Sequence, residues 1–478
     1  MLLSCIIVEH IAGISTGSWF FKGEHSLKYI SEAIAIFILL GLLSYSCKDP
    51  DQYDALPPDN PRQNILLIII DTLRADHLSC YGYSRQTSPS LDSLAESGTI
   101  WSNAQAQAPW TLPAHATIWT GLSVRSHRTL NPVAAGEENG EVVKLIYELD
   151  TDLPSLPVIL RDAGFSTFGL ANFTILSSIY GFNEGFDTYS CHPTGEGRAA
   201  VSVDSLMLWL DDHHRERFFC MLHLYDVHSP YSPPGGFNTA FQDDPDNTFF
   251  DWELDGDTIL NRDDLQLAVD LYDGEIRWVD ENLDRLFRRL RRYDLEDETL
   301  VLVMSDHGEE FLEHGWVLHG NTLYQEALHV PLIMSGPGID AGVVDTTWIG
   351  QFDILPTLIA WAGVESDAVF DGTDILDSPD PQRAIPSSGN TPLQWQEQWP
   401  IASSVSGGVK TIMMNNMEDF VTYRLNEDPA EMNPLPGDSG GIEDVLYYWA
   451  SPQIGFPEFA ESDPQSIQAL KDLGYLDD

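Results

Sequence analysis

The sequence predicts an α/β protein with a doubly wound, mostly parallel sheet and helices on both faces. Three short, largely apolar runs indicate this fold: residues 64–70 (NILLIII), 218–224 (FFCMLHL) and 300–304 (LVLVM). Polar residues bound each run, which is typical of strands buried on both faces of a parallel sheet. Helical patterns such as residues 265–292 lie between the runs. Strands that alternate with helices are the pattern of a doubly wound sheet.

The chain around these runs divides by composition. Residues 48–62 are rich in proline and aspartate and lack periodicity, as expected of a linker. We therefore predict a catalytic domain over 63–365. In 366–478, proline, serine, glycine and aspartate cluster first, and shorter strand-like pieces follow at 409–413 and 419–425. This texture predicts a smaller C-terminal α+β subdomain and a tail.

Residues 1–47 are interpreted as a targeting segment. An uncharged run at 33–43 (AIAIFILLGLL) is short for a membrane span and suits a signal-peptide core. Two interpretations stay open: a signal peptide, with Cys47 as a lipidated residue, or a membrane anchor helix over 27–46. Both place the catalytic domain outside the cytoplasm, in the periplasm, at the cell surface or secreted.

The composition restricts the partners. The formal net charge is −50, from 24 basic and 74 acidic residues. A basic face is therefore not expected, and nucleic acid is excluded as a partner. Two explanations of the acidity remain open. One is adaptation to high salt, which screens self-repulsion, and the other is an ordinary acidic protein outside the cytoplasm.

The five cysteines have no CxxC spacing, which argues against zinc-ribbon and thioredoxin chemistry. Nothing in the sequence supports a disulfide between Cys80 and Cys191, and nothing excludes it.

Acidic and imidazole side chains follow the three predicted strands. Asp71 comes after the first run, Asp226 and His228 after the second, and Asp306 with His307 after the third. Open α/β sheets place their ligand sites at the carboxyl ends of the strands, so we expect a shared site there. Asp226 is the ambiguous member, because a turn-capping role competes with a role in a second metal site.

Thr111 lies at the start of a predicted helix, in the segment APWTLPAHATIWTG. Pro113 favours a helix start here, and Thr111 is expected at or near the N-cap. The backbone N–H groups and the helix dipole stabilise a negative oxygen at such a position. A hydroxyl still needs a metal or a base to become a good nucleophile.

A divalent cation beside Thr111 would meet this need, with Asp71, Asp306 and His307 as its ligands. The carboxylate-rich set favours one Ca²⁺, Mg²⁺ or Mn²⁺ ion and makes Zn²⁺ less suitable. A single histidine is expected at this ion. A second ion would require Asp226, His228 or His319 as ligands.

Several segments together resemble the sulfatase family of the alkaline phosphatase superfamily. They are residues 64–127, 223–234, 305–338 and 351–364, and more loosely 409–435. The combination of SDHGE with LYQEALHVPLI is specific to that family. The resemblance implies an alkaline phosphatase-like fold and a metal-dependent ester hydrolase. It also assigns the metal ligands to Asp71, Asp306 and His307.

The resemblance implies further roles, residue by residue. Thr111 falls on the nucleophile position, with Pro113 and His115 in the second half of the family motif. His228 corresponds to a histidine that contacts the transferred oxyanion. His319 stands where many members have a lysine that contacts the substrate or the leaving group. Asn131 matches a substrate-binding asparagine.

Arg74, in DTLRADH, is a further candidate for substrate binding, with a salt bridge on the loop as the alternative.

The nucleophile position departs from the family pattern. Sulfatases convert a cysteine or serine into formylglycine, which threonine cannot become, so no formylglycine is expected at Thr111. We therefore predict a hydrolase of sulfate or phosphate esters, with phosphorus esters favoured. The substrate would be a small anionic ester, or a sulfated or phosphorylated glycan or lipid. The alternatives are a phosphoryl head-group transferase and a catalytically inactive protein that binds anions or glycans.

Overall fold

The computed structural model describes residues 63–129, 134–138, 141–145, 149–150, 152–192, 198–242, 262–390, 400–414 and 419–436. The targeting segment 1–47 with Cys47, the linker 48–62 and Asn131 lie outside these ranges, so the predictions made for them stay predictions. No helix in the described ranges is long and apolar enough to cross a bilayer.

The main sheet has eight strands in the order β12-β2-β11-β8-β1-β7-β5-β6. Their bounds are β1 Asn64–Ile70, β2 Thr99–Gln105, β5 Ser166–Ala171, β6 Thr188–Cys191, β7 Phe218–Leu224, β8 Thr299–Met304, β11 Leu332–Ser335 and β12 Val343–Gly350. Every neighbouring pair is parallel except the two that involve β11. The predicted doubly wound, mostly parallel sheet is confirmed, with one antiparallel strand inside it.

Strand β1 lies in the middle of the sheet and contributes side chains to two hydrophobic cores. Its side chains alternate, so that Ile65, Leu67 and Ile69 belong to one core and Leu66, Ile68 and Ile70 to the other. In register, Ile70 pairs with Leu224 of β7 and Ile69 with Met304 of β8. The residues that follow these three strands therefore emerge side by side at one edge of the sheet.

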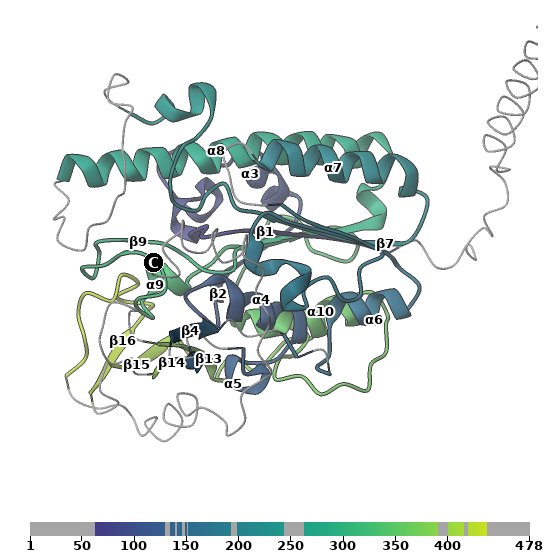
Figure 1. Ribbon diagram of the computed structural model, residues 1–478. Helices are drawn as coiled ribbons and strands as arrows, with labels where there is room; N and C mark the ends of the chain where they lie inside the picture. Colours follow the sequence, from purple (N-terminus) through teal and green to yellow (C-terminus); the bar gives the residue numbers. More distant parts are fainter. Residues whose placement is uncertain are drawn as a thin grey trace, which may run out of the picture. The chain divides into compact units, whose positions relative to one another are not determined.

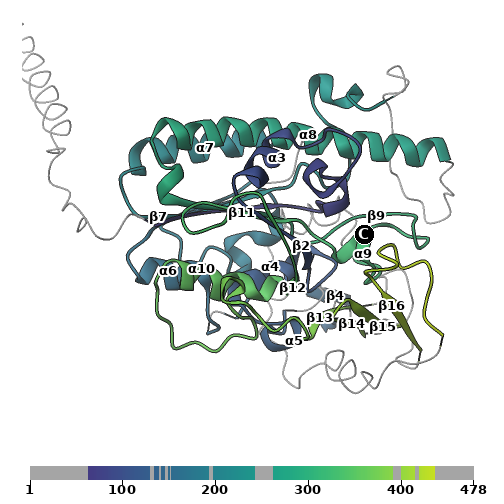
Figure 2. The ribbon, with the colours of Figure 1, turned by 180° about the vertical axis from the view of Figure 1, so that it is seen from behind.

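Helices cover both faces of the sheet (Figures 1 and 2). One face carries α3 (Pro89–Glu96), α7 (Arg198–His213) and α8 (Arg262–Arg292), and the other carries α4 (Thr111–Thr120), α6 (Leu156–Asp162) and α10 (Ile354–Trp361). Two short helices are α5 (Val124–His127) and α9 (Gln325–Leu328). The 3₁₀ helices are Ala75–His77, Ser79–Tyr81, Thr174–Leu176, Ser178–Tyr180, Gly235–Thr239, Glu296–Glu298, Gln351–Asp353 and Ile375–Asp377.

A smaller antiparallel sheet lies in the C-terminal part, in the order β13-β14-β15-β16. Its strands are Ile385–Asn390, Pro400–Ser406, Val409–Met413 and Phe420–Arg424, which confirms the two strands predicted there. The backbone N–H of Ser388 donates to the Gln107 carbonyl at 2.8 Å, so β13 is attached just before α4. The 3₁₀ helix at 375–377 is the only helix that the described residues after 365 contain.

Two hairpins complete the described structure. One joins β3 (Ala134–Glu138) to β4 (Glu141–Leu145), and the other joins β9 (Glu310–Phe311) to β10 (Val317–Leu318). The second hairpin follows directly from the end of β8 and therefore borders the predicted site.

Candidate active site

The predicted metal ligands meet at the carboxyl edge of the sheet. Asp71 follows β1, and Asp306 and His307 follow β8; all three are fully buried. His307 Nε2 lies 3.5 Å from Asp71 Oδ1 and 3.6 Å from Asp306 Oδ2. The parallel register of β1 and β8 brings Asp71 close to Asp306 and His307, because both strands end at the same edge of the sheet.

Helix α4 brings Thr111 to the same point. Trp110 is extended (φ −164°, ψ 162°), Thr111 is the first helical residue, and Pro113 occupies the first turn, where its missing N–H costs nothing. Thr111 is fully buried, and its Oγ1 lies 3.4 Å from His307 Nε2. The predicted nucleophile and the predicted ligands therefore form one cluster.

The polar atoms of this cluster fit a divalent cation. His307 Nδ1 donates to the Gly308 carbonyl at 2.9 Å, which leaves the Nε2 lone pair facing two carboxylates. Both carboxylate oxygens of Asp71 and Oδ2 of Asp306 are buried and have no hydrogen-bond partner. Buried charges are normally paired or bound to metal, since leaving them unpaired is costly. A cation held by these residues would offset the charge of both carboxylates.

Burial and neighbouring charges shift the pKa values of the three predicted ligands. Burial, reinforced by the charge of Asp306, raises the pKa of Asp71 well above its usual value. Burial also acts to raise the pKa of Asp306, but His307 and the histidines beside it outweigh that effect and lower it. For His307, the two carboxylates outweigh burial and raise the pKa.

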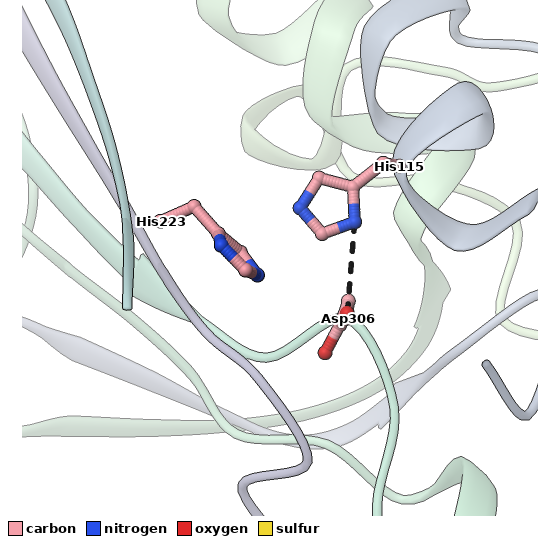
Figure 3. Close-up of side chains that lie close together, drawn as sticks. All are labelled: His115, His223 and Asp306. Carbon is pink, nitrogen blue, oxygen red and sulfur yellow. Dashed lines mark ion pairs between the residues drawn. The ribbon is translucent and has the colours of Figure 1, made fainter. Parts of the chain in front are cut away.

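Two further histidines border Asp306, as Figure 3 shows. His115, on α4, donates from Nδ1 to the Thr111 carbonyl at 3.0 Å and lies 3.6 Å from Asp306 Oδ2. His223, on β7, places Nε2 3.3 Å from Asp71 Oδ2. Both side chains are fully buried. Sequence reasoning missed His223, although an imidazole inside the apolar run FFCMLHL was a usable signal.

The expectation of a single histidine at the ion stays a prediction, with His307 as the histidine of the predicted ligand set. Within the described ranges, two groups have the spacing of metal ligands: Asp71–Asp306–His307 and His115–His223–Asp306. Neither contains Asp226, His228 or His319, which were the ligands expected for a second ion. His223 reaches the cluster because it is the second-last residue of β7, whose carboxyl end lies at the same edge of the sheet.

Asp226 adopts the capping role. Its Oδ1 accepts the backbone N–H of Ala199, in the first turn of α7, at 3.0 Å and the indole N–H of Trp278, on α8, at 3.1 Å. Asp226 thus joins two helices of one layer, and burial raises the pKa of its carboxyl to about 6.

His319 lies next to His307, and His228 lies next to His319. The ring centroid of His319 is 4.5 Å from that of His307 and 4.7 Å from that of His228. His319 Nδ1 lies 2.9 Å from Oε1 of Glu309, and Tyr231 donates its hydroxyl to Oε2 of Glu309 at 2.8 Å. Glu309 was not among the predicted site residues, although it lies only two residues after His307 in SDHGE.

Burial keeps these imidazoles neutral. Burial, together with His319, lowers the pKa of His228 to about 3, and burial with His307 lowers the pKa of His319 well below its usual value. Burial raises the pKa of Glu309 to about 7.

Arg74 forms the salt bridges expected of the alternative reading. Its guanidinium pairs with Asp76 at 2.8 Å and with Glu313 at 2.5 Å, and it donates to the Glu309 carbonyl at 3.0 Å. These contacts tie the loop after β1 to the hairpin after β8. A substrate contact by Arg74 stays a prediction. Cys80 and Cys191 are free thiols, so the disulfide left open by the sequence does not form.

A small depression of about 120 Å³ lies beside the loop that carries His319. Asn321 and Thr322 line it from this loop, Trp316 from the preceding hairpin, and Ile401 and Met413 from the small sheet. It therefore combines an indole ring, an amide and a hydroxyl in one surface.

Comparisons with known proteins agree with this architecture. A family model described as sulfatase matches residues 63–364. An N-acetylglucosamine-6-O-sulfatase of Bacteroides thetaiotaomicron is 23% identical over 531 residues, covering 88% of this chain and 91% of that protein. The structure of BT4656 in complex with its substrate D-glucosamine-2-N,6-O-disulfate shares the fold, with a TM-score of 0.66 and 21% identity, and covers 81% of this chain and 96% of that one. The phosphonate monoester hydrolase of Agrobacterium radiobacter has a TM-score of 0.64 at 19% identity, covering 87% and 96%.

Proposed function

The chain belongs to the sulfatase family of ester hydrolases, and we propose that it is a metal-dependent hydrolase of sulfate or phosphate esters with Thr111 as its nucleophile. One observation carries this proposal: Thr111 Oγ1 lies 3.4 Å from His307 Nε2, beside two buried carboxylates, and both oxygens of Asp71 and Oδ2 of Asp306 have no hydrogen-bond partner. The hydroxyl would therefore lie beside a cation that these groups hold, and such a cation can activate it.

The proposed cation is Ca²⁺, Mg²⁺ or Mn²⁺, held by Asp71, Asp306 and His307. When bound, it would lower the pKa of the Thr111 hydroxyl and offset the negative charge of the transferred group. The start of α4 contributes backbone N–H groups that favour a negative oxygen at Thr111.

The proposed reaction has two steps. Thr111 Oγ1 loses its proton and forms a bond to sulfur or phosphorus, while the bond to the leaving oxygen breaks. The proton lost by Thr111 ends on that oxygen. His319, whose Nδ1 lies 2.9 Å from Glu309 Oε1, contacts the leaving group, and His228 contacts the anionic group. Water then attacks sulfur or phosphorus, the bond to Thr111 Oγ1 breaks, and the freed oxygen regains a proton.

Phosphorus esters are favoured over sulfate esters. Threonine cannot provide the aldehyde that lets a sulfatase expel sulfate, whereas a phosphothreonine can be cleared by water. Related proteins act on both classes, as the names of the N-acetylglucosamine-6-O-sulfatase and the phosphonate monoester hydrolase state. We propose that the depression beside Trp316 and Asn321 contacts the next part of a sulfated or phosphorylated glycan. The proposed location outside the cytoplasm rests on the N-terminal sequence.

A substrate panel tests the proposal. Aryl sulfates, phosphate monoesters, phosphate diesters and phosphonates are assayed with the wild type, Thr111→Val and Thr111→Ser. Loss of the nucleophile in Thr111→Val, which keeps the shape of the side chain, is expected to lower kcat by about 10³-fold or more. Thr111→Ser keeps a hydroxyl and is expected to retain turnover. Turnover that survives Thr111→Val would refute Thr111 as the nucleophile.

A second measurement examines the intermediate directly. Rapid quench followed by mass spectrometry should find a phosphorylated or sulfated peptide that contains Thr111. Binding of the panel substrates without any turnover by the wild type would instead support the inactive, anion-binding alternative.

A further inference from the structure

We propose that His223 is a positioning residue that holds Asp71 in place for the cation, and that it is not itself a metal ligand. The inference rests on the metal centre of the proposed function and extends it to a residue outside the ligand set.

Hydrogen bonding on the far edge of the ring determines the tautomer of His223. The backbone N–H of Asn172, directly after β5, donates to His223 Nδ1 at 3.4 Å. Since Nδ1 accepts, the proton of the neutral ring is on Nε2. Asn172 is itself fixed, because its Oδ1 accepts the hydroxyl of Ser202, on α7, at 2.9 Å. Two elements outside the cluster thus set which nitrogen of His223 carries the proton.

The protonated edge of the ring faces Asp71. His223 Nε2 lies 3.3 Å from Asp71 Oδ2, whereas Oδ1 of the same carboxylate lies 3.5 Å from His307 Nε2. The two oxygens of Asp71 therefore face different partners: one faces the proposed cation site and the other faces a donor. A carboxylate whose orientation is fixed through one oxygen loses less conformational entropy when its other oxygen binds a cation, so it binds the cation more tightly.

The same tautomer argues against a second cation on His115, His223 and Asp306, although these residues have ligand spacing (Figure 3). A cation at this site would bind the Nε2 lone pair of His223, so the proton of the neutral ring would have to be on Nδ1. The N–H of Nδ1 would then point at the backbone N–H of Asn172. Two donors would then face each other in a site that is fully buried. With the proton on Nε2 instead, Nδ1 accepts the N–H of Asn172, and the N–H of the ring faces Asp71 Oδ2 at 3.3 Å.

His115 complements this arrangement from the helix side. Its Nδ1 is bonded to the Thr111 carbonyl at 3.0 Å and lies 3.6 Å from Asp306 Oδ2. Each of the two ligand carboxylates therefore has one imidazole beside it, from β7 for Asp71 and from α4 for Asp306.

Cation affinity tests the proposal without reference to turnover. The full chain is freed of metal with a chelator and titrated with Co²⁺, which is followed by its visible absorption in the wild type, His223→Leu, His223→Asn and His223→Gln. Glutamine places its amide N–H near the position of Nε2, whereas asparagine is too short to reach Asp71. His127→Leu is the matched control, because His127 is also buried and bonds to Thr117 on α4 at 3.0 Å.

We expect the Kd for Co²⁺ to rise about 10- to 100-fold in His223→Leu and His223→Asn, which is the usual effect of losing a group that orients a ligand. His223→Gln should stay within about fivefold of the wild type, because it restores the donor. His127→Leu should bind Co²⁺ as the wild type does. The stoichiometry should be one ion per chain throughout.

Three outcomes would overturn the proposal. The first is unchanged affinity in both His223→Leu and His223→Asn. The second is two ions in the wild type and one in His223→Leu, which would make His223 a ligand. The third is a wild-type chain that binds no Co²⁺, and this result alone would also remove the metal centre of the proposed function. Because His223→Asn keeps a small polar side chain, it provides the comparison if His223→Leu fails to fold.

Discussion

Replacement of Lys410 by methionine should destabilise the protein strongly. Lys410 Nζ, on β15, lies 3.0 Å from Glu431 Oε1, and neither side chain has any exposed surface. Burial lowers the pKa of Lys410 and raises that of Glu431, and each charge partly offsets the effect on the other. In Lys410→Met the carboxylate of Glu431 stays buried without its counter-charge. Breaking a buried ion pair on one side costs about 3–5 kcal/mol.

That cost corresponds to a fall in Tm of about 6–10 °C for a large domain. Differential scanning calorimetry of the wild type and Lys410→Met measures it. The double variant Lys410→Met/Glu431→Gln removes both charges, and we expect it within about 1–2 kcal/mol of the wild type. Arg161→Met serves as the control, because the Arg161–Asp162 pair is exposed and its loss should change stability by less than about 0.5 kcal/mol.

A Tm of Lys410→Met within 2 °C of the wild type would refute the reasoning.

The ion pair of Lys410 and Glu431 also supports the candidate site. Glu431 Oε2 accepts the backbone N–H of Gln325, at the start of α9, at 2.6 Å. The next residues of α9 accept the N–H groups of Gly308 and Glu309 at 2.8 and 3.0 Å. Lys410→Met should therefore also weaken cation binding beside Gly308.

Three further predictions concern the site and its surroundings. Binding of a cation at about 100 times its Kd contributes about 2.7 kcal/mol to stability, so removing it with a chelator should lower Tm by about 5 °C. In Asp306→Asn, which lacks a ligand carboxylate, the chelator should not change Tm. Gly308→Ala should lose cation binding in the Co²⁺ titration, because an added Cβ would lie 2.0 Å from the Glu326 carbonyl oxygen. Gly236→Ala, where no atom lies within 4 Å of the added Cβ, should keep it. Burial raises the pKa of Glu310 to about 8 from 4.5, so the folded state retains a proton that the unfolded chain releases, and the free energy of unfolding should fall as pH rises from about 4.5 to 8. Urea titrations at several pH values should show that fall reduced in Glu310→Gln, and an equal fall in both proteins would contradict the assignment.

The cluster of Asp71, Thr111, Asp306 and His307 was predictable because local rules and register determine it. Asp71 and Asp306 each follow an apolar run, and parallel strands end at one edge of the sheet. Thr111 precedes a proline suited to the first turn of a helix. Each residue could therefore be placed at the edge without knowledge of its neighbours.

The residues that sequence reasoning missed or misplaced depend on contacts between distant segments. Glu309 was overlooked because its partners, His319 and Tyr231, come from other loops. Asp226 was left between two roles, and only the positions of α7 and α8 decide that it joins the helices. The antiparallel insertion of β11 between β2 and β8 likewise follows from chain topology, which an apolar run does not encode.

The sequence by itself determined that this protein is a member of the sulfatase family, and it predicted threonine at the nucleophile position. It also determined that carboxylates and imidazoles gather at one sheet edge, because alternation and strand ends follow local chemistry. The tertiary structure decided which histidines join them. His223 lies within an apolar strand, and its importance comes from Asp71 on β1 and from the backbone of Asn172 after β5. A side chain whose role is set by two other strands acquires that role only when the sheet assembles.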